Sequence, residues 1–299
     1  MKSITSKSEI TFEKNEDYWD KDNVHIDKIK FSYYDGSDQD SLARGFTDGS
    51  YTVARLFPAS SNFASVEEKY KDNIYNTQPS AGVAVFGFNI DRQAYNHTSK
   101  TSDEQKSSTK KAILNKNFRQ AITFALNREN YSAQVNGKDY AKAAIRNMYT
   151  APAFVQVNGK DFGDVVADKL QTYGDQWSGV NLADGQNGLY SKEKAKAQFE
   201  KAKAELQKEG VQFPIHLDLP VDQSVKKGVQ EASSFKQSIE SILGDDNVVI
   251  DIQMLTTEEM DSIGYLANTA AQKDYDLYNG GWSPDYQDPS TYLDTLSLT

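Results

Sequence analysis

Residues 213–255 read FPIHLDLPVDQSVKKGVQEASSFKQSIESILGDDNVVIDIQML, and this stretch decides the fold class. It begins with apolar side chains at alternate positions, which is typical of a half-buried β-strand. Residues 225–243 then carry apolar side chains at helical spacing up to Gly244, and residues 248–255 return to a strand pattern. A strand, a helix and a second strand in this order indicate parallel strands joined by a right-handed crossover, so the sequence predicts an α/β fold.

The same alternation of elements continues toward the end of the chain. Residues 256–271 are expected to form a helix that begins with a capping box between Thr256 and Glu259, and residues 275–281 are expected to form a third strand. Together the segments make a β-α-β-α-β unit with three parallel strands. In such sheets ligands bind beyond the carboxyl ends of the strands. The segment 280–285, which reads GGWSPD, follows the third strand at that end.

Upstream of residue 213 the pattern is less regular but still predicts several elements. Residues 81–90 read as a strand, and residues 92–111 are so polar that we expect an exposed loop. A helix with an apolar stripe should begin at Asn115, which has the side chain of an N-cap residue. A second helix should begin at Ser191 and end before Gly210.

Composition limits the classes of function. The chain has 299 residues, which is enough for one large or two medium domains, and its net charge is −10. An acidic chain lacks the concentrated positive surface that DNA, RNA or anionic lipid would need. There is no cysteine, which excludes disulfides, thiolate metal sites and cysteine nucleophiles. No apolar run is long enough to span a bilayer.

No catalytic or metal-binding constellation is evident in the sequence. The histidines His25, His97 and His216 are far apart and have no metal-type spacing, and no nucleophile elbow, P-loop or dinucleotide-binding motif occurs. The acidic run 35–40 has some likeness to a calcium loop, but Phe46 stands where the bidentate Glu is needed. We therefore predict no catalytic residue, no metal and no cofactor.

The segment that follows the third predicted strand has the composition of a binding site. Gly280 and Gly281 would let a ligand backbone approach closely, so that an extended peptide could pair with the strand. Trp282 supplies an apolar wall, and Asp285 supplies a carboxylate for a cationic group. The same residues would also suit a tight turn with a packed Trp and a capping Asp, and spacing alone leaves both interpretations open.

Three segments carry a resemblance to a known family. Residues 282–289 (WSPDYQDP) resemble the Trp-x-x-Asp-Tyr-x-x-Pro signature of the oligopeptide-binding proteins of ABC importers, which are the family-5 extracellular solute-binding proteins. Residues 12–19 (FEKNEDYW) and 118–128 (FRQAITFALNR) are similar to two other motifs of that family, in the same order. The resemblance covers nearly the whole chain and is greatest to the streptococcal Ami/Ali oligopeptide-binding lipoproteins.

The resemblance implies a role for each residue near the motif. Asp285 would hold the α-ammonium group of a peptide, and Trp282 would line side-chain pockets. The backbone of Gly281 and Ser283 would pair with the peptide backbone. Some relatives have an Arg three residues before the Trp that contacts the peptide carboxylate. In this chain Asn279 takes that position, so a fixed carboxylate clamp is not expected.

The resemblance also implies an architecture and a function. The fold would be an α/β periplasmic-binding-protein type II fold with mixed sheets flanked by helices. Residues 1–85 would be part of the first lobe, and residues 86–299 a second lobe truncated before its return crossing. The chain would belong to a longer extracellular lipoprotein, whose signal and lipid-bearing cysteine lie outside this sequence.

Such a protein would act as a monomer that delivers oligopeptides to an ABC permease in the membrane, without nucleic acid as a partner. Two alternatives stay open. One is a surface adhesin or peptide-sensing module with the same fold, and the other is a peptide hydrolase with an unrecognised carboxylate pair.

Overall fold

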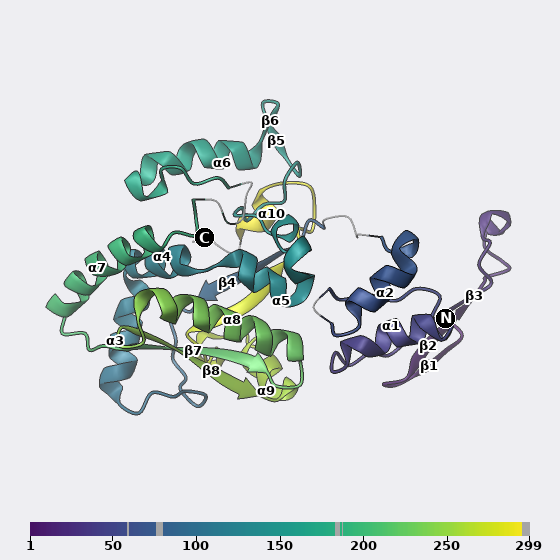
Figure 1. Ribbon diagram of the computed structural model, residues 1–299, viewed down its shortest axis with the longest axis horizontal. Helices are drawn as coiled ribbons and strands as arrows, with labels where there is room; N and C mark the ends of the chain where they lie inside the picture. The colour runs from purple at the N-terminus through teal and green to yellow at the C-terminus, as the bar shows by residue number, and fades with distance from the viewer. Residues whose placement is uncertain (59, 76–79, 183–185, 187, 295–299) are drawn as a thin grey trace.

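The computed structural model describes residues 1–58, 60–75, 80–182, 186 and 188–294. Figure 1 shows an N-terminal group of elements to one side of a larger body. The N-terminal group comprises β1 (Ser3–Thr5), β2 (Glu9–Glu13), η1 (Lys21–Asn23), β3 (Lys28–Ser32), α1 (Gln39–Thr47), α2 (Phe63–Tyr70) and η2 (Lys71–Asn73).

The strands β1, β2 and β3 form an antiparallel sheet in that order. Its cross-strand pairs place Ile10 opposite Phe31 and Phe12 opposite Ile29, so one face of the sheet is apolar. Phe31 is 59% exposed and Ile29 is 44% exposed, which leaves this face open to solvent in the described chain.

The larger body contains the remaining elements. They are β4 (Val83–Phe88), α3 (Asp103–Leu114), α4 (Lys116–Ala125), α5 (Arg128–Tyr140), η3 (Lys142–Ala144), β5 (Gln156–Val157), β6 (Lys160–Asp161), α6 (Phe162–Leu170), η4 (Gln171–Tyr173), η5 (Asp175–Trp177), α7 (Lys192–Lys208), β7 (Ile215–Asp222), α8 (Lys226–Leu243), β8 (Val248–Leu255), α9 (Thr257–Ile263), η6 (Ala270–Gln272), β9 (Leu277–Trp282) and α10 (Ser290–Leu293). Figure 1 shows α8 running alongside β7 and β8, with α4 and α7 to one side. No helix in the described ranges is long and apolar enough to cross a bilayer.

The predicted strand–helix–strand unit of residues 213–255 is confirmed. β7 and β8 pair in parallel with Leu217 opposite Ile250, and α8 joins them. The apolar residues of β7 and the inward face of α8 are buried in one core with those of α4 and α7. α8 ends at Gly244, whose φ of +87° is a conformation that glycine adopts without strain.

The predicted helix starts are confirmed where a side chain satisfies a free backbone N–H. Asn115 accepts a hydrogen bond from the N–H of Phe118, and Ser191 accepts one from the N–H of Lys194. The capping box of Thr256 is present as well, but α9 ends at Ile263, well before the expected residue 271.

The third strand does not join the parallel pair as predicted. β9 pairs antiparallel with β4, with Phe86 opposite Asn279 and Ala84 opposite Gly281. The β-α-β-α-β prediction was therefore wrong for its last strand, because hydrophobic periodicity shows that a strand exists but does not identify its partner. One contact with β7 remains just before β9 begins. The N–H of Asp276 donates to the carbonyl of Asp218 over 3.1 Å.

The expectation of an exposed loop over residues 92–111 was also wrong. The helix α3 begins within it, and Ser102 caps that helix by accepting from the N–H of Gln105. Its Thr109 is buried and donates to the carbonyl of His216 on β7 over 2.8 Å. Arg92 and Lys100 are buried as well, at 4% and 5% exposure, because they pair with buried carboxylates.

Candidate functional site

The predicted binding segment lies at the end of β9 and is held in place by α10. The indole Nε1–H of Trp282 donates to the carbonyl of Thr291 over 2.7 Å, and the N–H of Asp285 donates to the hydroxyl of Thr291 over 2.9 Å. The next residue, Tyr292, is fully buried, and its hydroxyl donates to the carbonyl of Ala81 over 2.5 Å. The loop after β9 is thus closed by bonds to α10, a short helix whose Thr291 and Tyr292 are buried.

Both glycines of this segment have a close neighbour at the place where a Cβ would stand. A Cβ on Gly281 would lie 3.1 Å from the carbonyl oxygen of Val83, and a Cβ on Gly280 would lie 3.3 Å from the ring of Tyr278. Glycine at 281 is therefore explained by close pairing with β4. It does not by itself indicate that a ligand approaches there.

β9 nevertheless offers an open backbone edge. Within the residues that the structure describes, β9 pairs with β4 alone, so its other edge has no strand partner there. From Tyr278 to Ser283, no backbone group bonds to a described residue outside β4. An extended peptide could add to such an edge through main-chain hydrogen bonds.

The polar side chains of the segment differ in whether they already have a hydrogen-bond partner. Asp285 and Ser283 are exposed, and within the described part of the chain no hydrogen bond or ion pair engages the carboxylate of Asp285. Asn279 is exposed too, but its amide donates to the hydroxyl of Tyr131 on α5 over 2.8 Å. The carboxylate of Asp285 is thus free for a cationic ligand group, while Asn279 already has one internal partner.

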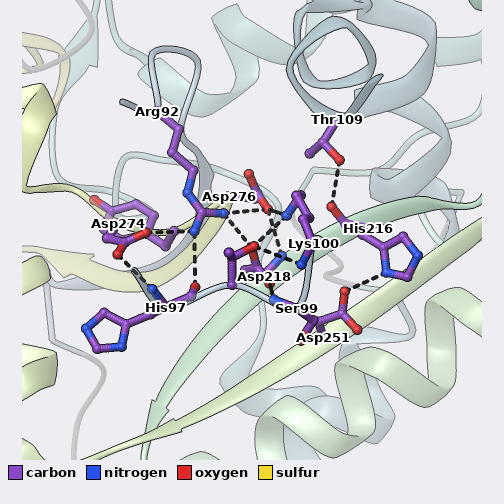
Figure 2. A network of polar contacts seen from close by, with 12 residues as sticks. Arg92, His97, Ser99, Lys100, Thr109, His216, Asp218, Asp251, Asp274 and Asp276 are labelled. Carbon is purple, nitrogen blue, oxygen red and sulfur yellow. Dashed lines mark hydrogen bonds and ion pairs between the residues drawn. The ribbon is translucent and has the colours of Figure 1, made fainter. Parts of the chain in front are cut away.

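A buried ionic cluster lies at the other end of β9 and was missed by the sequence analysis (Figure 2). Arg92 contacts Asp218 at 2.6 Å, Asp274 at 2.7 Å and Asp276 at 2.9 Å. Lys100 contacts Asp218 at 2.6 Å and Asp276 at 2.5 Å. All five side chains are at most 2% exposed. The cluster joins β7, the segment before β9 and the loop after β4.

The charged groups of the cluster shift one another's pKa values. Burial alone would raise the pKa of Asp218, but the ammonium of Lys100 and several donated hydrogen bonds bring that pKa down to about 2. Burial raises the pKa of Asp276, and Lys100 and Arg92 offset this only in part. The guanidinium of Arg92 has a pKa above its ordinary range, because three carboxylates outweigh the effect of its burial. The cluster therefore holds the guanidinium of Arg92 firmly charged.

One signal in the sequence could have revealed this cluster. Asp218 lies between Leu217 and Leu219 in a strand whose residues are nearly all buried, and a charge in that position needs a partner. His216 lies on the same strand, where its Nδ1 is 2.8 Å from a carboxylate oxygen of Asp251 on β8 and its side chain is 20% exposed.

Comparison with known proteins gives a consistent family. The family model described as bacterial extracellular solute-binding proteins, family 5 Middle, matches residues 1–299. The chain is 58% identical over 300 residues to the oligopeptide-binding protein AmiA of Streptococcus pneumoniae, covering 100% of this chain and 46% of that protein. It is 60% identical over 297 residues to the oligopeptide-binding protein AliB of the same species, covering 99% of this chain and 46% of that protein. The chain thus spans about half the length of these relatives.

Solved structures show the same fold. The substrate-binding domain of an oligopeptide ABC transporter from Bacillus anthracis matches with a TM-score of 0.63 at 22% identity, over 97% of this chain and 46% of that one. Listeria monocytogenes OppA bound to peptide matches with a TM-score of 0.61 at 21% identity, over 97% of this chain and 47% of that one. The predicted α/β fold of the type II periplasmic-binding proteins is therefore confirmed.

Proposed function

Because this chain belongs to the bacterial extracellular solute-binding proteins of family 5, we propose that it is part of an oligopeptide receptor that delivers peptides to an ABC import permease. The observation that carries the proposal is the high identity to oligopeptide-binding proteins along the whole chain, combined with an open strand edge at the matching motif. The receptor binds peptides and releases them unchanged.

In this proposal the peptide lies along the free edge of β9. The backbone of Gly280, Gly281 and Ser283 faces the peptide backbone, and Trp282 lines a side-chain pocket. Asp285 holds the peptide ammonium group, because its exposed carboxylate has no partner among the described residues. Main-chain pairing is insensitive to peptide sequence, whereas one charge pair sets the register.

The proposal extends to the architecture and location of the longer protein. Residues 1–85 belong to the first lobe and residues 86–299 to the second, and the peptide is enclosed between the lobes. The protein acts as a monomer outside the cytoplasmic membrane, to which a lipid anchor attaches it. The open apolar face of β2 and β3 is consistent with further structure in the first lobe.

Uptake of a labelled oligopeptide by cells tests the function. Cells that lack the gene for this chain are expected to lose uptake, and cells that lack the permease are expected to lose it equally. Uptake that continues without the permease, or that does not depend on the gene, would favour an adhesin or sensing role. The purified full-length product is also incubated with the same peptide and examined by mass spectrometry, and cleavage of the peptide would rule out the transport receptor in favour of a hydrolase.

A further inference from the structure

A second polar group lies beside the proposed peptide strand, on the face of β9 that is turned toward α5 and α8. Its outermost member is Asn279, which bonds to the hydroxyl of Tyr131 at 2.8 Å. Phe86 lies directly opposite Asn279 in the sheet, so the two side chains share one face. The ring of Tyr131 meets the ring of Phe86 edge-on, with 5.3 Å between the centroids. These contacts hold the hydroxyl of Tyr131 next to the amide of Asn279.

The acidic member of the group is Glu231 on α8. It lies one helical turn before Phe235, whose ring packs on Phe86 with 4.4 Å between the centroids. Its side chain is only 12% exposed, and Lys227 Nζ lies 3.9 Å from Oε1, which is too far for a hydrogen bond. Burial raises the pKa of Glu231, with Lys227 opposing this rise. Burial, and after it the nearby carboxylate of Glu231, raises the pKa of Tyr131.

The hydrogen-bonding capacity of this group is unbalanced. In the described part of the chain, no donor reaches the carboxylate oxygens of Glu231 or the amide oxygen of Asn279. The donors that these side chains have left among the described residues are the hydroxyl proton of Tyr131 and the second amide N–H of Asn279, fewer than the acceptor sites on the oxygens of Glu231 and Asn279. A largely buried carboxylate without hydrogen bonds is costly, and an ammonium or guanidinium group would supply both the charge and the donors.

We propose that Glu231, Tyr131 and Asn279 form a subsite for a cationic side chain, lysine or arginine, of a peptide bound along β9. The subsite rests on the proposed function and adds to it a preferred class of peptide. The carboxylate of Asp285, beyond the end of the strand, takes the amino end of the same peptide. Because an extended chain advances about 3.3 Å per residue, the cationic side chain is expected at about the third to sixth residue of the peptide.

Lys227 competes with the ligand in this arrangement. Its side chain is 41% exposed and makes no hydrogen bond to Glu231, so it can move into solvent when a ligand cation enters. Removing Lys227 should therefore increase the preference for cationic peptides, whereas neutralising Glu231 should abolish it. A purely structural role for Glu231 would not produce these opposite effects.

A lysine scan with the full-length gene product tests the subsite. The probes are free-amine nonapeptides of alanine and glutamine in which one position, from the second to the eighth, holds lysine or norleucine. Calorimetry is expected to show binding about 10-fold tighter for lysine than for norleucine at one of the third to sixth positions. The advantage should fall below about 3-fold in Glu231→Gln and should grow in Lys227→Met. It should be unchanged in Glu258→Gln, which removes the same charge from an exposed helix position.

The possible results separate the subsite from the function. If norleucine peptides bind as tightly as lysine peptides at every position, or if the advantage persists in Glu231→Gln, the subsite is wrong while the peptide receptor stands. If no peptide binds at all, the proposed function is wrong and the subsite with it. Melting curves confirm that Glu231→Gln is folded, and Lys227→Met, at an exposed position, gives a second measurement that does not depend on a buried change.

Discussion

Replacing Lys100 with Met removes one of the two cations of the buried ionic cluster and keeps the length of the side chain. The ammonium of Lys100 lies 2.6 Å from Asp218 and 2.5 Å from Asp276, and its side chain is fully buried. Without it, three carboxylates would share Arg92 alone. Breaking a buried ion pair in this way costs about 3–5 kcal/mol, so we expect the free energy of unfolding to fall by about that amount.

Urea unfolding of the full-length gene product at neutral pH measures this loss. Lys110→Met is the matched control, because Lys110 lies 3.7 Å from Asp91 at the surface and should contribute about 1 kcal/mol or less. Adding Asp276→Asn to Lys100→Met removes one of the three carboxylates that would otherwise share Arg92, and it should restore part of the stability. If Lys100→Met unfolds within about 1 kcal/mol of the wild type, or if the double variant is no more stable than the single one, the cluster does not stabilise the fold as argued.

Three further predictions concern the strands around the site. The pKa of Asp218 is lowered from an ordinary 3.8 to about 2. This shift stabilises the fold by about 2 kcal/mol above pH 3.8, and the contribution is lost as the pH falls toward 2. The stability difference between wild type and Asp218→Asn, measured by urea unfolding, should therefore shrink between pH 4 and 2. Trp282→Phe loses the bond to Thr291 and should destabilise by about 1 kcal/mol, while Trp19→Phe at an 85% exposed position should change nothing. Gly281→Ala should lower the melting temperature measured by calorimetry, because its Cβ would crowd the partner strand.

Local structure was largely predictable from the sequence. The helices that start at Asn115 and Ser191 are set by a capping side chain followed by an apolar stripe, and both features lie within a few residues of one another. The parallel pair β7–β8 was predictable for a similar reason, since a connection made of one crossover helix leaves few alternatives.

Long-range structure was not predictable from such patterns. The partner of β9 is β4, far back in the chain, and nothing in the periodicity of either strand specifies the other. The polar composition of segment 92–111 predicts an exposed loop, because charged side chains usually face solvent. Arg92 and Lys100 are buried instead, because Asp218 and Asp276, more than a hundred residues later, neutralise them. Charge pairing between segments that are distant in the sequence cannot be identified from local composition.

The candidate site was predictable only in its linear part. The motif from Trp282 to Pro289 is contiguous, so the sequence locates the exposed carboxylate of Asp285 directly. The polar group around Asn279 depends on contacts among β9, α5 and α8, so Tyr131 and Glu231 became candidates only once the fold was known. The roles of these residues in binding stay predictions.

Binding of one peptide in its free-amine and N-acetylated forms to the full-length gene product tests the central claim most directly. The same two measurements are made on Asp285→Asn. If Asp285 holds the peptide ammonium group, acetylation and the substitution should each weaken binding on the order of 30- to 1,000-fold, and together they should weaken it little more than either alone. Equal affinity for the free and acetylated peptides in the wild-type protein would contradict a peptide site at the end of β9 with Asp285 as its amine ligand.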